Sequence, residues 1–402
     1  MSDRAVGSRV GRAIEAIGPA LAVLALIGFI AQVGISVMLP LLPVYATELG
    51  APPFVLGLLT SSFAVTNAIG QLGSGFLSER TGVRRVMTVG VGLYAAMNAL
   101  IATAASAIWL VAWRTLAGFG GGAMIVTERI YVAQVTDPSR RAFANSIISA
   151  AQSAGSVAGP ALAAVALDIG GLRAPFVLVA ATSGIAFIGT LFLPSPAARI
   201  VRPDDAPAAE EPPLQVGTLA ILLAANVALL SSYGAFITTY GPLATTELGW
   251  ATAEVAIAFS FFGGGSIVLG PVLGNLADRI GRQRVAMVAP LPLTVFALVL
   301  VAGLPHAVVY AAAFLAGGGL TAFSAAWYAL LAEAAGERRL ARTFGIISAA
   351  SAAGIVFGAL AAAELWERVD IVAGMLLGGI TPLLAGLAML VLRGRPLQAV
   401  PA

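Results

Sequence analysis

The stretch Gly274-Asn-Leu-Ala-Asp-Arg-Ile-Gly-Arg-Gln-Arg284 occurs twice in this chain, in two closely related forms. The earlier form is Gly75-Phe-Leu-Ser-Glu-Arg-Thr-Gly-Val-Arg-Arg85, which lies 199 residues upstream. Other segments recur at the same offset, and Ile147-Ile-Ser-Ala-Ala151 is repeated in full at 346–350. The offset holds without a gap from about residue 43 to about residue 164. A repeat of this length indicates a tandem duplication, so two equivalent structural halves are expected.

The composition is typical of a membrane protein. Hydrophobic residues make up 59% of the chain and charged residues only 10%, whereas soluble domains are about 25% charged. Apolar runs of about 20 residues recur along the whole chain, and each is long enough to cross a bilayer as a helix. The lipid bilayer is therefore the first expected partner.

Several classes of function are disfavoured by residues that the sequence lacks. It contains no cysteine and a single histidine, His306, so thiolate and multi-histidine metal sites are excluded and no metal or cofactor is expected. There is no phosphate-binding Gly-x-x-x-x-Gly-Lys-Ser/Thr loop of a nucleotide-driven pump. We also find no nucleophile and base pair that would indicate an enzyme.

Twelve apolar segments predict twelve transmembrane helices. They lie at about 19–45, 53–77, 85–105, 107–135, 143–167, 174–194, 216–245, 252–277, 284–303, 306–334, 342–363 and 371–392. The predicted domains are a tail at 1–18, a six-helix bundle at 19–194, a proline-rich linker at 195–215, a second six-helix bundle at 216–393 and a tail at 394–402.

The distribution of positive charge predicts the orientation in the membrane. All 22 basic residues are arginine, and most lie in the two tails and in the loops after even-numbered spans. Arg114 and Arg129 lie within a span, and only Arg173 and Arg368 lie on the other side. Arginine-rich loops stay in the cytoplasm, so both termini should be cytoplasmic. The net charge of +3 therefore reflects membrane orientation and does not indicate nucleic-acid binding. The first apolar segment is too long for a signal peptide and should remain as a span of a plasma-membrane protein.

The repeated stretch, Gly-x-Leu-Ala-Asp-Arg-x-Gly-Arg-x-Arg between two apolar segments, resembles the signature loop of the major facilitator superfamily. The second copy is close to that pattern, and the first has Glu79 for aspartate and Val83 for arginine. The resemblance implies an all-α membrane protein, with twelve transmembrane helices in two pseudo-symmetric six-helix bundles around a central cavity. It also implies secondary transport.

The two loops are candidates for a conformational latch. A carboxylate at the end of one helix can pair with an arginine or a helix terminus in one state and separate in the other. The alternative is that the arginines only anchor the loops on the cytoplasmic side. The candidate latch residues are Gly75, Glu79, Arg80, Gly82, Arg84, Arg85, Gly274, Asp278, Arg279, Gly281, Arg282 and Arg284.

The fourth span carries the candidates for proton coupling. Arg114, followed by Gly118 and Gly120, resembles the Arg-x-x-x-Gly-x-Gly pattern of many proton-coupled members of the family. Arg114 and Glu128 fall on one helical stripe, about 21 Å apart along the axis. A charge inside the membrane costs about 2.5 kcal/mol or more, which favours a function for Arg114, Glu128 and Arg129. The alternative is that Glu128 and Arg129 are paired structurally with neighbouring helices.

The fifth span contains Gly155-Ser-Val-Ala-Gly159-Pro160. This segment resembles the Gly-x-x-x-Gly-Pro-x-x-Gly-Gly motif associated with exporters that exchange substrate for protons, although Ala163 and Ala164 replace the last two glycines. Gly155, Gly159 and Pro160, with Gly118 and Gly120, are therefore candidates for helix packing and gating. Close packing alone is the alternative, because small residues at this spacing are common in membrane bundles.

Polar and aromatic residues inside the spans are candidates for a substrate cavity. They are Gln32, Ser36, Asn226, Tyr233, Tyr240, Trp327 and Tyr328. At the repeat offset Trp327 corresponds to Glu128, so we expect the first half to handle the coupling ion and the second to contribute more of the substrate surface. The alternative for the polar stripe is burial between helices.

Together these features predict a secondary active transporter that moves a small organic solute by alternating access, in proton-coupled efflux (antiport). A nutrient or sugar importer, or a facilitator of the same fold, is the alternative within transport, and a non-transporting membrane sensor is the alternative outside it. The expected partners are a small-molecule substrate, protons and lipid, with no nucleic acid. We expect the protein to act as a monomer.

Overall fold

The first half of the chain forms six long helices. The computed structural model describes residues 19–136, 140–195, 216–335 and 337–392, and no β-strand occurs in these ranges. The predicted tails and nearly all of the predicted linker lie outside them. The helices of the first half are α2 (Pro19–Glu48), α3 (Pro53–Thr81), α4 (Val83–Ala102), α5 (Ala107–Val135), α6 (Arg141–Gly170) and α7 (Ala174–Phe192).

The second half repeats this plan with two interruptions. Its elements are α8 (Val216–Pro242), η4 (Leu243–Glu247), α9 (Thr252–Ile280), α10 (Arg282–Val288), α11 (Leu291–Val301), α12 (His306–Ala335), α13 (Glu337–Arg368) and α14 (Ile371–Val391). Pro290 separates α10 from α11, because proline lacks the N–H that continues a helix. The two helices together form one span.

The predicted number of spans is confirmed for the described residues. Eleven stretches are long and apolar enough to cross a membrane, and one of them, at 143–192, is 50 residues long. That stretch contains α6 and α7, which are separated by a short 3-10 turn at Gly171–Arg173. Counting these as two helices gives the twelve spans of the predicted all-α fold.

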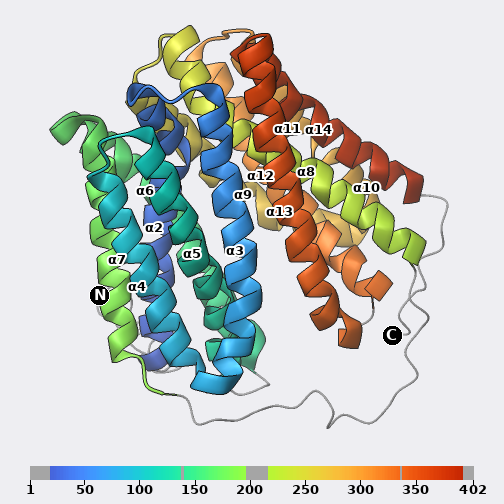
Figure 1. The fold of residues 1–402 in the computed structure, drawn as a ribbon. Helices are drawn as coiled ribbons and strands as arrows, with labels where there is room; N and C mark the ends of the chain where they lie inside the picture. The colour runs from blue at the N-terminus through green and yellow to red at the C-terminus, as the bar shows by residue number, and fades with distance from the viewer. Residues whose placement is uncertain (1–18, 137–139, 196–215, 336, 393–402) are drawn as a thin grey trace, which may run out of the picture.

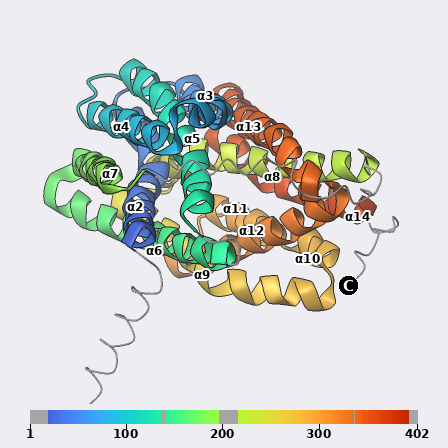
Figure 2. The same cartoon turned by 90° about the horizontal axis from the view of Figure 1, so that it is seen from below.

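The two halves meet along two helix pairs, α3 with α13 and α6 with α9. In the repeat, α3 corresponds to α9 and α6 to α13, so the two contacts are equivalent by pseudo-symmetry. Figure 1 shows the first half on the left and the second half on the right, and Figure 2 shows the same arrangement from below. The molecule is therefore two helical bodies joined along two matching seams.

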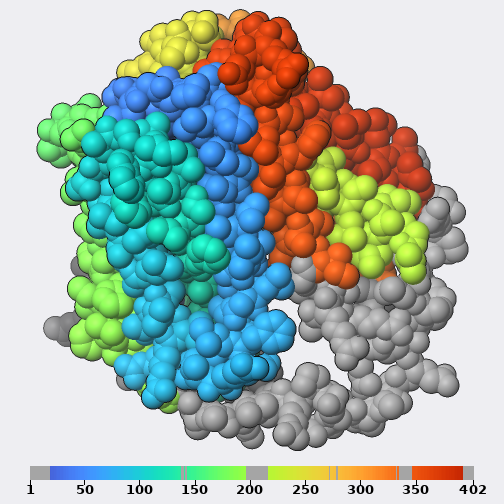
Figure 3. Space-filling model, in the orientation of Figure 1, coloured from blue at the N-terminus to red at the C-terminus, as the bar shows by residue number. Residues whose placement is uncertain are grey.

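The seam between α3 and α13 is tight at the end away from the linker. There Gly57 of α3 lies so close to α13 that an added Cβ would stand 2.9 Å from the carbonyl oxygen of Ala359. Toward the linker the side chain of Phe76 is 72% exposed. Figure 3 shows the two halves in contact above and parted below. The structure is closed on one side and open on the side from which the linker leaves.

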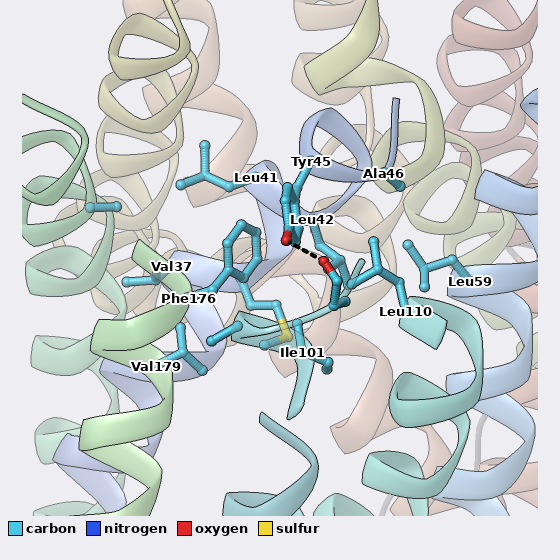
Figure 4. Close-up of a cluster of buried hydrophobic side chains, with 14 of the residues drawn as sticks. Val37, Leu41, Leu42, Tyr45, Ala46, Leu59, Ile101, Leu110, Phe176 and Val179 are labelled. Carbon is cyan, nitrogen blue, oxygen red and sulfur yellow. Dashed lines mark hydrogen bonds between the residues drawn. The ribbon is translucent and has the colours of Figure 1, made fainter. Parts of the chain in front are cut away.

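A buried aromatic contact fixes the closed end of the first half. The hydroxyl of Tyr45 donates a hydrogen bond of 3.0 Å to the carbonyl oxygen of Ala104, in the loop between α4 and α5. Its ring stacks on Phe176 at 4.7 Å between centroids. Figure 4 shows this pair among buried aliphatic side chains from α2, α3, α5 and α7, including Leu59 and Leu110. The contact ties α2, α7 and the loop between α4 and α5 together at the closed end.

Glycines let helix backbones touch within each half. A Cβ on Gly317 of α12 would overlap the carbonyl oxygen of Phe262 in α9. At the equivalent position Gly118 of α5 packs against α3, where a Cβ would stand 2.8 Å from the carbonyl oxygen of Phe63. In lipid, such close contact supplies the packing energy that apolar burial alone does not provide.

We predict that Gly317→Ala lowers stability while Gly73→Ala does not. The added methyl group at Gly317 must push α12 away from α9, and overpacking costs about 1–3 kcal/mol. Gly73 also lies inside a helix but has open space around it, and alanine is favoured over glycine in helices by about 1 kcal/mol. Thermal unfolding of the two detergent-purified variants measures the difference. Equal midpoints for both would contradict the packing role of Gly317.

Candidate functional site

A central cavity of about 290 Å³ lies between the two halves. Residues of α2, α3, α5, α8, α12 and α13 line it. Most of the lining is apolar, and none of the described lining residues is a carboxylate. Its polar and charged members are Thr60, Asn67, Gln71, Arg114, Arg129, Tyr233, Tyr328, Ser348 and Ser351.

Arg114 is a buried cation in this cavity. Its side chain is only 6% exposed, and its guanidinium carbon lies 3.7 Å from the ring centroid of Phe63. One N–H donates to the sulfur of Met38 at 2.9 Å, and the hydroxyls of Tyr94 and Tyr233 are its other electrostatic neighbours. No carboxylate among the described residues pairs with it. The positive charge is therefore held by an aromatic face and neutral dipoles.

A row of amide and hydroxyl side chains crosses the cavity from one half to the other. Ser348 of α13 donates to the Oε1 atom of Gln71 in α3 at 3.2 Å. Gln71 donates in turn to Asn67 at 2.8 Å, and Asn67 to the carbonyl oxygen of Gly118 at 3.5 Å. This row lies on the seam that must separate or close when the halves move.

Glu128 lies outside the central cavity. It lines a separate small pocket of about 20 Å³ between α2, α4, α5 and α6, together with Gln32 and Gln152. Gln152 donates to both carboxylate oxygens, at 3.1 and 3.0 Å. The absent side chain of Gly28 leaves room for the carboxylate, since a Cβ there would stand 3.3 Å from Oε1. The prediction that Glu128 and Arg114 face the same direction is therefore wrong. Their directions around the axis of α5 differ by about 40°, and this difference turns Glu128 toward α2 and α6.

Gln152, the partner of Glu128, lies one helical turn from the seam between α6 and α9. Ser156 donates to the carbonyl oxygen of Gln152 at 3.2 Å. The backbone of Ser156 meets α9, where a Cβ on Gly263 would stand 3.2 Å from the Ser156 carbonyl oxygen. Gln152 therefore lies one helical turn from the contact between α6 and α9.

The structure divides the predicted substrate residues into two groups. Tyr233 and Tyr328 line the central cavity. Trp327 and Tyr240 are buried elsewhere, and each donates a hydrogen bond to a carbonyl oxygen, that of Leu222 at 2.8 Å and of Val255 at 2.9 Å. The acceptors belong to neighbouring helices, so these hydrogen bonds orient each ring toward the helix that supplies the acceptor.

The three polar candidates also lie away from the central lining. The hydroxyl of Ser36 donates to the carbonyl oxygens of its own helix and of Gly155 in α6, so it joins two helices. Asn226 is buried and donates to Ser351 at 2.8 Å, behind the cavity wall. Gln32 lines the pocket of Glu128.

The polar cavity residues that the sequence did not predict are Thr60, Asn67, Gln71, Ser348 and Ser351. Asn67 and Gln71 stand one helical turn apart in a transmembrane helix, and this spacing was the available signal. Ser348 and Ser351 lie in an alanine- and serine-rich segment that is equally typical of close packing. Nothing in their pattern distinguishes cavity lining from packing.

The two signature loops are sharp turns with equivalent contacts. Gly82 and Gly281 have φ angles of +90° and +106°, a region that favours glycine. Arg84 donates to the carbonyl oxygen of Leu191 at the end of α7, and Gln283, the matching residue, to that of Met389 at the end of α14. Each loop therefore binds the last turn of the final helix in its half, α7 or α14.

The ionic contacts of the loops differ between the halves. Arg282 pairs with Glu333 of α12 at 2.5 Å. Glu79 is exposed and pairs with no residue in the described ranges, and the side chain of Asp278 lies outside the description. Arg80, Arg85, Arg279 and Arg284 are exposed, and a Cβ on Gly75 or Gly274 would meet nothing within 4 Å.

The predicted gating glycines are points of close approach between helices. Gly155 and Gly159 of α6 lie against α2, and a Cβ on Gly159 would stand 2.6 Å from the carbonyl oxygen of Val33. Gly120 of α5 lies against α4, and Pro160 lies inside α6. Their gating role remains a prediction.

Comparison with known proteins identifies the class. The family model described as Major Facilitator Superfamily matches residues 24–243 and, again, 221–401. These matches cover nearly the whole chain. The protein therefore belongs to the major facilitator superfamily and is a multi-pass membrane transporter, as its fold and repeat predicted.

Two curated relatives are named for drug resistance. The chain is 27% identical to "Multidrug resistance protein MdtG" of Proteus mirabilis (strain HI4320) over 283 residues, which are 67% of this chain and 70% of that protein. It is 26% identical to "Quinolone resistance protein NorA" of Staphylococcus aureus over 165 residues, 41% of this chain and 42% of that protein. The second match spans less than half of either protein.

Solved structures of low sequence identity share the fold. A crystal structure of a mutant of the nucleoside transporter NupG superimposes with a TM-score of 0.78 at 12% identity, covering 93% of this chain and all of that chain. A bacterial homologue of the human lysosomal transporter Spinster, in an inward-facing and occupied conformation, gives 0.74 at 16% identity and covers 95% and 98%. Identities this low show the fold alone.

We predict that the adjacent residues Trp327 and Tyr328 respond differently to substitution. Trp327→Ala should lower the unfolding free energy by about 3–5 kcal/mol, because it empties a buried site. Tyr328 lines the cavity and is 48% exposed, so Tyr328→Ala should alter substrate affinity with little loss of stability. Thermal unfolding and substrate binding, measured on both variants, test this. A stable Trp327→Ala protein with impaired binding would contradict the assignment.

Proposed function

We propose that this transporter exports a small organic solute in exchange for protons by alternating access, from a plasma membrane in which both termini are cytoplasmic. The observation that carries the proposal is the central cavity, which lies between two pseudo-symmetric halves, closed at one end and parted toward the linker. The printed names of the MdtG and NorA relatives support export as the direction. The arginine-rich loops on the linker side support a cytoplasmic position for that side.

Alternating access follows from the two seams. Each half is stiff, because its helices touch through glycines and share buried cores. The contacts between the halves are mainly those of α3 with α13 and of α6 with α9, and α2 and α8 add smaller contacts with each other and with α9 and α3. Rocking about the middle of these seams would close the linker side and open the other, and the substrate would face one side at a time.

The proton step is assigned to Glu128. An ionised carboxylate only accepts hydrogen bonds, whereas a protonated one also donates. In the structure Gln152 donates to both oxygens. Protonation would place an O–H donor opposite these N–H groups, and turning the Gln152 amide to present its oxygen would relieve that mismatch. Because Gln152 is one turn from the contact with Gly263, this rearrangement favours one position of α6 against α9. Arg114 and Arg129, on the same helix, shape the local field.

The signature loops act in the same cycle as a latch. On the open side Glu79 has no partner in the described ranges, as expected for the state in which the latch is released. When the linker side closes, Glu79 and its equivalent Asp278 would come within reach of arginines or a helix terminus of the opposite half. The arginines then have two roles, since they also hold the loops in the cytoplasm.

We predict that Glu128→Gln abolishes proton-driven transport and preserves substrate binding. The amide resembles the protonated carboxyl in shape but cannot change charge, so a pH gradient has no group to act on. In proteoliposomes the variant should exchange labelled substrate down its gradient but fail to accumulate it when a pH gradient is imposed. Glu364→Gln, which removes an exposed carboxylate at the opposite side, is the matched control and should behave like the parent. Uphill transport by Glu128→Gln would rule out Glu128 as the proton carrier.

A further inference from the structure

The central cavity has a one-sided charge. Arg114 and Arg129 line it, and none of its described lining residues is an aspartate or glutamate. A buried charge without a counter-charge is costly, because the surrounding dipoles replace water only in part. The sulfur of Met38 is a weak acceptor, and the face of Phe63 attracts the guanidinium only through its quadrupole. Among the described residues, the guanidinium of Arg114 is thus paired by weak or neutral groups alone.

A separate, small apolar pocket lies next to the central cavity. A second pocket of about 30 Å³ lies within the C-terminal half and is lined by Phe236, Phe259, Phe262 and Phe296. Tyr233 lines both this pocket and the central cavity, and it is also an electrostatic neighbour of Arg114. A cation and an aromatic pocket therefore adjoin through one side chain.

We propose that the substrate is an organic anion, with its acidic group on Arg114 and an aromatic or aliphatic group directed past Tyr233 into the phenylalanine-lined pocket. This inference rests on the proposed transport function and names its substrate class. Guanidinium binds carboxylate or phosphate oxygens through two parallel N–H groups, and such charge-assisted pairs are about twice as strong as neutral hydrogen bonds. Amides of Asn67 and Gln71 are available as further polar contacts in the same lining.

Cations are disfavoured by the same arrangement. An organic cation in the central cavity would meet the guanidinium of Arg114 and no carboxylate among the described lining residues. Like charges repel strongly at low dielectric, so a cation should bind more weakly than an anion of the same shape. Glu128 lines a different pocket, where Gln152 donates to it and Arg129 is its electrostatic neighbour, so it leaves the charge of Arg114 unpaired by any described carboxylate. The proton site and the substrate site are separate.

The test compares three probes of one shape that differ in charge: naphthalene-1-acetate, its neutral amide and the corresponding naphthylethylammonium. Binding to the full-length protein in nanodiscs is measured by isothermal titration. The parent should bind the acetate at least about tenfold more tightly than the amide, which is about 1.4 kcal/mol, and the ammonium more weakly still. Equal affinities, or a preference for the ammonium, would overturn the proposal without any variant.

Variants then locate the anion. Arg114→Gln should remove the preference for the acetate, whereas Arg114→Lys, which keeps the charge but not the planar fork, should weaken binding and keep the preference. Arg173→Gln, at an exposed position far from the cavity lining, removes the same net charge and should leave the preference intact. If Arg114→Gln keeps the preference, the anion binds elsewhere and the proposal is wrong.

The outcome is distinguishable from failure of the transport proposal. Titration uses no gradient, so it reports the chemistry of the cavity and not the coupling. A parent that prefers the ammonium yet transports uphill with a pH gradient would overturn the anion proposal and leave proton exchange in place. A parent that prefers the acetate but whose transport does not respond to a pH gradient would support the anion proposal and overturn proton exchange.

Discussion

The absence of water in the bilayer core is the constraint on which this structure depends. Backbone polar groups must be satisfied inside helices, so the chain crosses the membrane as helices and assembles by packing those helices together. Where two backbones touch, as at Gly317 beside Phe262 and Gly118 beside Phe63, glycine is needed for steric reasons. The same contacts recur in both halves. Each half is consequently stiff, and movement is left to the seams between them.

The same constraint makes every buried charge informative. Arg114 is placed in the cavity between the halves, and Glu128 in a small pocket of the first half beside α6. In the proposed mechanism, their separation gives the two tasks of an exchanger to two sites on one helix, α5. Arg114 lines the central cavity, and Glu128 lies beside Gln152, one turn from the α6–α9 seam. Coupling between the sites then requires no direct contact, only a shared pair of states that each site favours differently.

The sequence predicts the fold well and the site only in part. Length and hydrophobicity set each span, so even the interrupted helix at Pro290 was predicted as one crossing, and the repeat offset assigned equivalent partners in the two halves. The rotation of each helix about its axis is harder to predict. Most helices here carry apolar side chains on all sides, because lipid and neighbouring helices both accept them. Trp327 and Tyr328 are adjacent, yet one is hydrogen-bonded inside the bundle and the other lines the cavity.

The central claim is that the two ends of the seam between α3 and α13 open in turn. The chain has no cysteine, so spin labels attach only where cysteines are introduced. One pair, at Phe76 and Ile346, reports the linker side, and a second pair, at Phe54 and Val369, reports the other; all four side chains are at least half exposed. Pulsed electron spin resonance on the parent and on Glu128→Gln, in nanodiscs at several pH values, gives both distances. We expect the two distances to change in opposite directions. Whenever more molecules show the shorter distance on the linker side, more should also show the longer distance on the opposite side. Distances that do not change, or that lengthen together at both ends, would contradict it.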